Sequence, residues 1–424
     1  MKNEKVKLGL IGLGTVGTGV VKVLKDYDNI EIKKIAVKNI NKKRDIENLD
    51  PSILTTDPFE IVNDPEIDIV VEVIGGTDPA FELLKTAINN KKHIVTANKE
   101  LLAKKGQELF NLANEKNVTI LYEAAIAGGI PIIMPIKTTL AGNKIHKIEA
   151  ILNGTTNYIL TKMEKDNVSY EEVLKEAQKL GYAETDPTGD VEGFDSAYKI
   201  ATLATIAFNQ RVDINKIYKE GITKISANDM QFAKELGYKI KLIALAKLTD
   251  DNKADVRVHP MLVPQKDCLA SINGVTNSVV LEGFPVGRVM FAGPGAGMFP
   301  TASSVLGDIL AIVSGIGSDN LLPFMKCNHT KNAQQISIEQ TTNRYYISIT
   351  ANNNPGVIGT IGKICGNHNI NLASVLQKGI DKENTARIII ITEESIEENI
   401  NNAIDELKNN SSIVKINNLI RVME

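Results

Sequence analysis

The sequence predicts an α/β protein in three parts: a doubly wound parallel sheet, an α+β domain and a small ferredoxin-like module. Three observations predict this fold class. A glycine-rich turn follows a short apolar strand near the N-terminus, strands and helices then alternate, and the C-terminal part is patterned strand–helix–strand–strand–helix–strand. We expect a first domain over residues 1–134 and a second over 135–319, of which about 297–319 return to the first. A linker over 320–343 and the module over 344–424 complete the predicted organisation.

The amino-acid composition is that of an ordinary globular protein. A chain of 424 residues is long enough for two or three domains, each with its own core. Its apolar share of 43% and charged share of 23% are ordinary for a globular protein. The net charge of -3 gives no reason to expect nucleic acid or an anionic membrane as a partner.

Cysteine usage and the N-terminus indicate the compartment. The three cysteines, Cys268, Cys327 and Cys365, are too widely spaced for a metal motif and are typical of a reducing environment. The N-terminal MKNEKVKLGLIG runs directly into a strand and has no apolar signal segment, and no apolar run reaches membrane-spanning length. We therefore expect a cytoplasmic protein.

The glycine-rich turn predicts a dinucleotide site. The apolar strand Val6–Ile11 leads into GLGTVG and then into a helix over residues 16–24. Glycines at these positions permit a tight turn and the close approach of a pyrophosphate to the N-terminus of the helix. The alternative, a turn with incidental glycines, is less consistent with this strand–turn–helix context. The cofactor-binding candidates are Gly12, Gly14, Thr15, Val16 and Gly17.

The end of the second predicted strand, residues 31–37, bears on cofactor choice. An NAD site commonly has Asp or Glu here, whereas a cation accommodates the 2′-phosphate of NADP. Lys38 stands at this position, and Lys42, Lys43 and Arg44 follow it. We expect NADP(H) to be preferred over NAD(H), although a solvated basic loop would have the same composition.

Three further strands are predicted at residues 68–74, 93–97 and 119–123, with helices over 79–90 and 101–116 between them. Ligands bind such sheets outside the carboxyl ends of the strands. Gly75, Thr96 and Lys99 fall there and are predicted to contact the cofactor, with Lys99 also near the substrate.

The segment YEAAIAGGIPII, residues 122–133, leads out of this sheet. The Gly128–Gly129 pair exposes backbone carbonyls, and with Glu123 these oxygens could ligate a hard cation. The residues alone favour a flexible hinge between domains.

The substrate region is predicted from two clusters. Asn153–Asn157 (NGTTN) follows a strand over residues 147–152 and suits an amino-acid carboxylate, or the N-cap of a helix, or both. Gly181–Lys199 (GYAETDPTGDVEGFDSAYK) is an acidic loop that runs into an apolar helix, on which Asp195 and Lys199 share one face. The alternative for that pair is a surface salt bridge of little energetic weight.

The remaining segments carry weaker signals. Helices are predicted over 158–165 and 170–180, and strands over 242–248, 256–258, 277–282 and 289–291. His259 precedes a proline at a strand end, so a structural role is more plausible than a catalytic one. After the glycine cluster GPGAG, Thr301 is predicted to cap a helix that runs to about Val313. In the module, the NNNPG turn at 352–356 precedes a helix whose free N–H groups suit a carboxylate.

Four blocks in this order resemble the homoserine dehydrogenase family: TANK at 96–99, NGTTNYIL at 153–160, GYAETDPTGDVEGFDSAYK at 181–199 and PTASSVLGD at 300–308. The resemblance covers nearly the whole chain, and the 181–199 block is highly specific. It implies reversible NAD(P)H-dependent reduction of L-aspartate 4-semialdehyde to L-homoserine, in the threonine and methionine branch of the aspartate pathway. The C-terminal module resembles an ACT domain, which implies L-threonine as an effector, although such a module can also serve dimerisation only. A homodimer or homotetramer is implied.

The resemblance also implies roles for individual residues. Lys199 is the first candidate for the general acid and base, paired with Asp195, and Lys99 is the second. Glu184 and Asp190 are expected to receive the ammonium and hydroxyl groups of the substrate, with Thr156 and Lys99 beside them, and Gly297 to lie near the cofactor. A monovalent cation, Na⁺ or K⁺, would be held by Glu123 and by the carbonyls of Ile126, Gly128 and Ile130.

Two rival functions are weighed against this one. Aspartate-semialdehyde dehydrogenase shares the substrate but acylates a cysteine, and none of the three cysteines lies in a setting typical of a nucleophile. A binding protein for nucleotides and amino acids would need no catalytic groups, whereas Lys99, Asp195 and Lys199 are all present.

Overall fold

The computed structural model describes residues 5–315, 327, 329, 331–380 and 384–423. It consists of two compact units. The first comprises Met1–Ile148, Tyr198–Asn215 and Thr276–Ala333. The second comprises Glu149–Ala197, Lys216–Val275 and Gln334–Glu424.

A six-stranded sheet forms the centre of the first unit, in the order β3-β2-β1-β4-β5-β6. All its strand pairs are parallel. The strands are β1 (Val6–Ile11), β2 (Ile30–Ala36), β3 (Leu54–Thr55), β4 (Ile69–Glu72), β5 (His93–Thr96) and β6 (Ile120–Leu121). The predicted doubly wound sheet is confirmed, with the short edge strand β3 as an addition. The order reverses between β1 and β4, and this switch point is where such sheets bind ligands.

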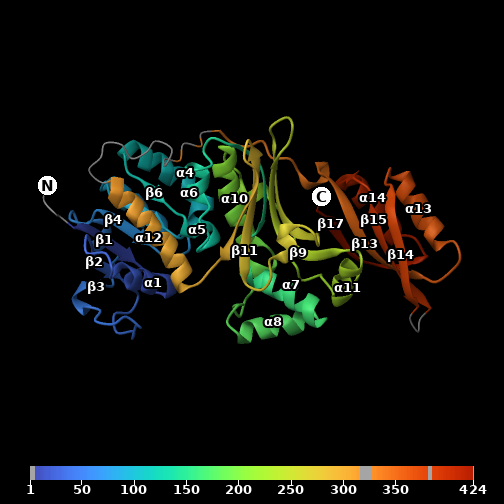
Figure 1. Ribbon diagram of the computed structural model, residues 1–424, viewed down its shortest axis with the longest axis horizontal. Coiled ribbons are helices and arrows are strands. Elements are labelled where there is room, and N and C mark those ends of the chain that lie inside the picture. The colour runs from blue at the N-terminus through green and yellow to red at the C-terminus, as the bar shows by residue number, and fades with distance from the viewer. Residues whose placement is uncertain (1–4, 316–326, 328, 330, 381–383, 424) are drawn as a thin grey trace. The chain divides into compact units, whose positions relative to one another are not determined.

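Helices pack on this sheet through apolar faces. The main ones are α1 (Thr15–Leu24), α3 (Ala80–Asn89), α4 (Lys99–Lys116) and α12 (Met298–Gly315). Helix α12, far from α1 in sequence, packs beside it, as Figure 1 shows in orange and blue. This packing brings residues 298–315 onto the first sheet's helices, whereas residues 316–319 of the predicted return lie outside the described residues. The prediction that Thr301 caps this helix is wrong, because α12 begins at Met298 and Thr301 is buried within its first turn.

Helix α12 is also the one helix of the described residues that is long and apolar enough to cross a membrane. Its apolar side chains, however, belong to the core of the first unit. Ala302, Val305, Ile309 and Ile312 are each 0% exposed and pack with residues of β1, β2 and α1. Helix α12 is therefore a core helix of this unit.

Shorter elements complete the first unit and its borders with the second. They are α2 (Phe59–Val62), α5 (Ala124–Ala127), α6 (Ile133–Lys137), β7 (Lys144–Ile151), α10 (Phe194–Phe208), β11 (Thr276–Phe284) and β12 (Gly287–Pro294). Strands β11 and β12 pair as an antiparallel hairpin, and β12 is longer than the predicted 289–291.

The second unit is built on a mixed sheet whose strands follow the order β9-β10-β17-β13-β15-β14. Strands β9 (Tyr238–Leu248) and β10 (Ala254–Pro264) are antiparallel and much longer than predicted. The other elements of this part are α7 (Gly154–Asp166), α8 (Tyr170–Lys179), α9 (Thr188–Val191), β8 (Tyr218–Lys219) and α11 (Ala227–Glu235). Helix α7 begins at Gly154, with Asn153 as its N-cap, so the NGTTN cluster opens the helix instead of preceding it.

The C-terminal module supplies the remaining strands of this sheet. Its elements are β13 (Thr342–Asn352), α13 (Val357–Asn367), β14 (Leu372–Ile380), β15 (Thr385–Thr392), β16 (Ser395–Ile396), α14 (Glu397–Lys408) and β17 (Ile413–Val422). The predicted β-α-β-β-α-β order is confirmed, with the two-residue β16 as an addition. Alternate residues of β13, among them Tyr345, Ile347 and Ile349, pack against α13 and α14 in one apolar core. Most of the predicted linker, residues 316–326, 328 and 330, lies outside the described residues, and β13 already begins at Thr342.

Candidate functional site

The glycine-rich turn has the geometry that a pyrophosphate requires. Gly12 has φ +106°, a region that L side chains rarely adopt, and a Cβ on Gly17 would lie 2.2 Å from the carbonyl oxygen of Gly12. Gly14 is the N-cap of α1 and has no side-chain cap, and a Cβ there would meet nothing within 4 Å. Thr15 and Val16 form the first turn of α1. The N–H groups of this turn are therefore open to an anionic ligand.

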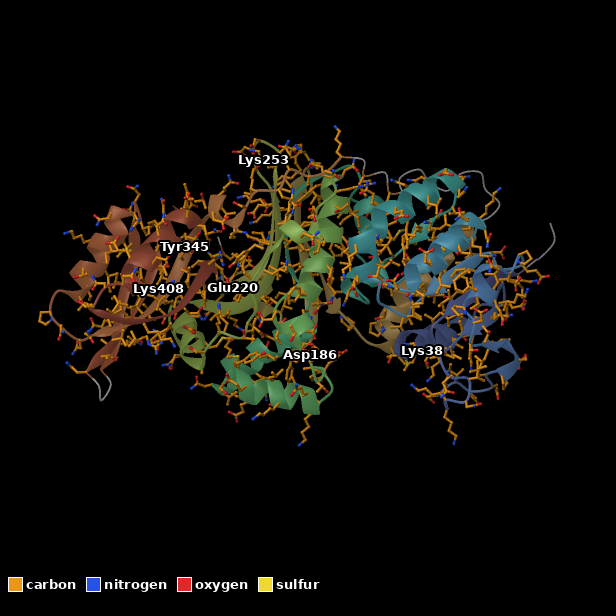
Figure 2. The ribbon with its side chains drawn as sticks, turned by 180° about the vertical axis from the view of Figure 1, so that it is seen from behind. Lys38, Asp186, Glu220, Lys253, Tyr345 and Lys408 are labelled. Atoms are coloured by element: carbon orange, nitrogen blue, oxygen red, sulfur yellow. The ribbon has the colours of Figure 1, made fainter. Side chains whose placement is uncertain are left out.

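The basic loop after β2 is organised by Arg44. Its guanidinium donates to the carbonyl oxygens of Asn39 (2.7 Å), Lys42 (2.8 Å) and Ile40 (3.2 Å). Arg44 thus serves the loop itself, whereas Lys38, labelled in Figure 2, is exposed at its start. Lys38, like Lys42 and Lys43, is therefore an exposed cation available to a 2′-phosphate, and of the three it lies next to the end of β2.

The carboxyl ends of β4 and β5 are joined by a buried acid, Glu72, that sequence reasoning missed. Its carboxylate accepts hydrogen bonds from the hydroxyl of Thr96 (2.6 Å) and from the backbone N–H groups of Ile74 (2.9 Å) and Gly75 (3.2 Å). Burial raises the pKa of Glu72 above its ordinary value, and these hydrogen bonds oppose the rise. The predicted cofactor residues Gly75 and Thr96 are thus held by one side chain.

Lys99 is the first residue of α4 and is half-buried. The preceding Asn98 caps the helix by accepting from the N–H of Leu101 (3.1 Å) and donates to the carbonyl of Gly76 (2.7 Å). The backbone around Lys99 is therefore fixed at the edge of the sheet where ligands bind.

The candidate cation segment already uses some of its oxygens. The carboxylate of Glu123 accepts from the N–H groups of Ile132 (2.6 Å), Ile133 (2.7 Å) and Met134 (2.7 Å). The carbonyl of Gly128 accepts from the hydroxyl of Ser304 (2.6 Å). Oε1 of Glu123 accepts two of these bonds, but Oε2 and the Gly128 carbonyl oxygen accept one each and have a further lone pair, which is compatible with a hard cation. No group of three or more His, Cys, Asp or Glu suited to a metal is found in the described part of the chain.

In the second unit, Asn153 joins the acidic loop to the start of α10. Its side-chain amide donates to Asp190 (2.6 Å) and to Asp195 (3.0 Å), while its oxygen accepts from the N–H of Thr156 (2.9 Å). One residue of the NGTTN block thus fixes α7, the loop and α10. Two carboxylates on one amide make a site that favours a cationic group.

Helix α10 carries the predicted acid–base pair. Asp195 and Lys199 lie one turn apart and are 7% and 8% exposed. Such burial excludes the alternative of an exposed surface pair. Asp195 thus belongs both to helix α10, which also carries Lys199, and to the hydrogen bonds of Asn153, which also bind Asp190.

The other predicted substrate residues differ in position. Glu184 is exposed, as is its neighbour Asp186, which was not predicted and is labelled in Figure 2. Asp186 accepts from the N–H of Thr188 at the start of α9 (3.1 Å). Thr156 is 1% exposed, and its hydroxyl donates within the cap to the side-chain oxygen of Asn153 (3.0 Å). Its contact with Asn153 supports a positioning role for Thr156.

A buried lysine on β9 supports the same cluster and was not predicted. Lys241 is 1% exposed and donates to the side-chain oxygen of Asn157 (3.1 Å) and to the carbonyl of Ile272 (2.5 Å). Burial lowers the pKa of Lys241 to about 8. Strand β9 also contains Lys239 and Lys247, so the sequence carries no signal that distinguishes Lys241 as the buried lysine.

A hollow of about 370 Å³ lies at the start of α13 in the C-terminal module. Gly356, with φ +91°, is the N-cap of α13 and has no side-chain cap. The NNNPG turn, the first turn of α13 and two strands supply its lining: Asn352, Asn353, Asn354, Pro355, Gly356, Val357, Ile358, Gly359, Gln377, Ala386 and Ile388. This combination of helix N–H groups and amides is suited to a small amino acid.

Three parts of the chain match known families. Residues 12–123 match the homoserine dehydrogenase NAD-binding domain, residues 131–310 match homoserine dehydrogenase, and residues 345–411 match the ACT domain. The homoserine dehydrogenase of a Synechocystis strain is 44% identical over 432 residues, with 99% of each chain covered. The chain belongs to the homoserine dehydrogenase family.

Solved structures of homoserine dehydrogenases agree with this assignment. The enzyme from Thiobacillus denitrificans superposes with a TM-score of 0.93 at 39% identity, over 99% of both chains. A hyperthermophilic archaeal homoserine dehydrogenase solved with NADPH has a TM-score of 0.63 at 27% identity and covers 73% of this chain. The expected family, its NAD(P)-binding domain and its ACT domain are confirmed.

Proposed function

We propose that the chain catalyses the reversible, NAD(P)H-dependent reduction of L-aspartate 4-semialdehyde to L-homoserine. The arrangement that supports this most directly is the pair of carboxylates, Asp190 and Asp195, on Asn153 at the start of the helix that carries Lys199. The two carboxylates suit the ammonium group of an amino-acid substrate. The buried amine of Lys199 suits proton transfer to the side chain of that substrate.

The roles of the chain's residues follow from this placement. The nicotinamide, when bound, supplies the hydride that reduces the aldehyde carbon. Lys199 donates a proton to the alkoxide oxygen that forms, and in the reverse direction it accepts the hydroxyl proton. Asp195, one turn earlier on the same face of α10, is the proposed partner of Lys199. Glu184 and Asp190 bind the ammonium and hydroxyl groups, and Lys99 is the second candidate for the proton donor.

The activity is tested by following absorbance at 340 nm with L-homoserine and NADP⁺ or NAD⁺. We expect reduced cofactor to form, faster at alkaline pH, because oxidation of the alcohol releases a proton. A folded sample that turns over with neither cofactor would contradict the proposal.

Cofactor preference is proposed to depend on Lys38. The first unit offers a phosphate-binding turn (Gly12, Gly14 and Gly17) and an exposed cation beyond β2, which fit NADP(H). Gly297, with φ +124°, precedes α12, whose Met298 carbonyl would lie 2.7 Å from a Cβ on Gly19. This close approach supports the proposed place of Gly297 near the cofactor turn.

Lys38→Asp is expected to remove any preference for NADP⁺, since a carboxylate repels the 2′-phosphate. We expect kcat/KM for NADP⁺ to fall about tenfold or more, with NAD⁺ use retained, because one lost ionic contact is worth roughly 1.5 kcal/mol or more. Lys43→Asp makes the same charge change in the same loop and should have a smaller effect. Unchanged NADP⁺ kinetics in the Lys38 variant would show that this lysine does not contact the ribose phosphate.

A monovalent cation, Na⁺ or K⁺, is proposed at the segment that follows β6. Glu123 and the carbonyls of Ile126, Gly128 and Ile130 would hold it, and it would stiffen the backbone between α5 and α6. The spare lone pairs of the Glu123 and Gly128 oxygens support this donor set. We also propose a cytoplasmic location and a homodimer or homotetramer.

The hollow in the ACT domain is proposed to bind L-threonine as a feedback inhibitor. Several-fold inhibition is expected, because coupling between two sites is typically about 1–3 kcal/mol. Deleting the ACT domain would be an unclear test, because its strand β17 pairs with β10. A substitution that fills the hollow leaves the sheet intact.

Gly359→Leu provides this test. Gly359 lies in α13 and lines the hollow, and a Cβ there meets nothing within 4 Å. We expect wild-type turnover and loss of threonine inhibition, measured as initial rates against threonine concentration. Gly366→Leu is the matched control, in open space on the same helix but outside the hollow, and should stay sensitive. Equal inhibition of both variants would indicate competition at the catalytic site instead.

A further inference from the structure

The short segment Tyr218–Lys224 lies between the C-terminal module and the end of the acidic loop. It begins with β8, which pairs with β10 in parallel through Tyr218 and Lys219. The N–H of Glu220 continues this pairing by donating to the carbonyl of Val258 (2.8 Å). One side of the segment is therefore anchored on the long central strand of the second unit.

The module holds this segment through a buried ionic cluster. Arg421 of β17 donates to Glu220 (3.0 Å) and, through Nε, to Glu397 (2.9 Å). The side chains of Arg421 and Glu397 are 3% and 2% exposed, and that of Glu220 is 23% exposed. Burial opposes the charge of Arg421, yet its ion pair with Glu397 raises its pKa above the ordinary value.

Two further contacts strengthen this side of the segment. The hydroxyl of Tyr218 donates to Glu220 (3.0 Å), and Asn418 of β17 donates to the carbonyl of Lys224 (3.2 Å). The hydroxyl of Tyr345 of β13 donates to Glu397 (2.7 Å); Glu220 and Tyr345 are both labelled in Figure 2. Because Arg421 also donates to the hydroxyl of Tyr218 (3.4 Å), both ends of the segment are bonded to β17 of the ACT domain.

On its other side the segment contacts the end of the acidic loop directly. The N–H of Ile222 donates to the carbonyl of Val191 (2.9 Å), and the hydroxyl of Thr223 donates to Glu192 (3.2 Å). A Cβ on Gly221 would lie 2.3 Å from the carbonyl oxygen of Val191. There is no space between the two backbones, so a shift of Glu220 must move the loop end.

The loop end adjoins the proposed substrate carboxylate. Val191 is the last residue of α9 and follows Asp190, whose side chain accepts from Asn153 (2.6 Å). The position of Asp190 is therefore set from two directions, by Asn153 and by the segment behind Val191. A continuous chain of packed and hydrogen-bonded groups connects β17 with Asp190.

We propose that Glu220 is a positioning residue through which the ACT domain sets the affinity of the catalytic site for its amino-acid substrate. Arg421 holds Glu220, Glu220 fixes the backbone at Gly221 and Ile222, and this backbone holds Val191 and so Asp190. An effector that shifts β17 changes the substrate affinity by the same route. The inference rests on the proposed function, which assigns Asp190 to the substrate.

The test compares Glu220→Gln with Glu235→Gln. Glu220→Gln keeps the size of the side chain but loses its charge toward Arg421. Glu235 of α11 forms an ion pair with Lys378 of β14, so its variant breaks another contact with the module, one that is exposed and away from the segment. Both variants retain Glu397 as the partner of Arg421, which should preserve folding.

We expect Glu220→Gln to raise KM for L-homoserine about threefold to tenfold and to weaken threonine inhibition, within the usual range of coupling between sites. The values of kcat and of KM for NADP⁺ should change less than about twofold, because the proposed effect acts on Asp190 and not on Lys199 or the glycine-rich turn. Glu235→Gln should match the wild type. Thr223→Val, an exposed change that removes the bond to Glu192, should raise KM for L-homoserine in the same direction.

Hydrogen exchange supplies a readout that needs no turnover. In Glu220→Gln, peptides containing Val191 and Ile222 should exchange faster than in the wild type and in Glu235→Gln. Unchanged exchange and unchanged KM in a folded Glu220 variant would overturn the proposal, as would equal effects in both variants. If the wild type did not oxidise homoserine, the proposed function would fail, while selective exchange in the Glu220 variant would still support the link to the loop.

Discussion

Replacing Lys199 by alanine is expected to lower kcat about 10²–10⁴-fold and to leave KM for NADP⁺ nearly unchanged. Lys199 is 8% exposed on α10, one turn after Asp195. Alanine removes the ammonium that is proposed to transfer the proton, and water has little access to replace it. Steady-state kinetics in both directions, with a melting curve to verify folding, measures the effect.

Two further variants separate proton transfer from charge. Lys199→Arg keeps a cation whose pKa is too high for efficient proton donation, so its kcat should also be low. Lys104→Ala removes a lysine that lies 5.7 Å from the ring of Tyr198, the neighbour of Lys199, and should have a kcat near that of the wild type. If Lys199→Ala kept a near-normal kcat, the role of proton donor would pass to Lys99.

Asp190→Asn is expected to raise KM for L-homoserine about tenfold to a hundredfold, because a hydrogen bond to a charged group contributes roughly 1.5–3 kcal/mol. The asparagine oxygen can still accept from Asn153, which is 2.6 Å away in the native protein, so the loop should keep its position. The substrate ammonium, however, loses its counter-charge. KM for each substrate, measured at saturation with the other, gives the result.

Asp186→Asn is the matched control for this substitution. Asp186 lies on the same loop, but it is exposed, and its carboxylate accepts from Thr188 at the start of α9. Its variant should keep a normal KM. An equal rise of KM for L-homoserine in both variants would show that substrate affinity depends on the net charge of the loop and not on the position of Asp190.

The regular parts of the fold could be predicted from local sequence. Buried parallel strands are continuous apolar runs, and GLGTVG marks the one turn where backbone must approach a phosphate, so the first sheet follows from its pattern. The same holds for the ACT domain, where the apolar residues of β13 alternate. Helix starts were less predictable: α12 begins at Met298, and no local signal distinguishes this from a start at Thr301.

The buried polar groups of the site could not be predicted, because their partners are distant in sequence. Glu72 is a single acid in an apolar strand, and its hydrogen bonds to Thr96, 24 residues away, follow only from the pairing of β4 with β5. Glu220 and Arg421 are 201 residues apart, and nothing near either one indicates the other. Such pairs depend on tertiary packing, which propensity and periodicity do not describe.

The pairing of β17 with β10 also has a consequence for biosynthesis. Arg421 pairs with Met261 and Val422 with Leu262, so this edge of β10 is completed by a strand that is synthesised long after β10 itself. Until then the unpaired N–H and C=O groups of β10 remain available to other chains. During synthesis, β17 of the ACT domain thus prevents β10 from pairing with other chains. We expect nascent chains that stop before β17 to depend on chaperones.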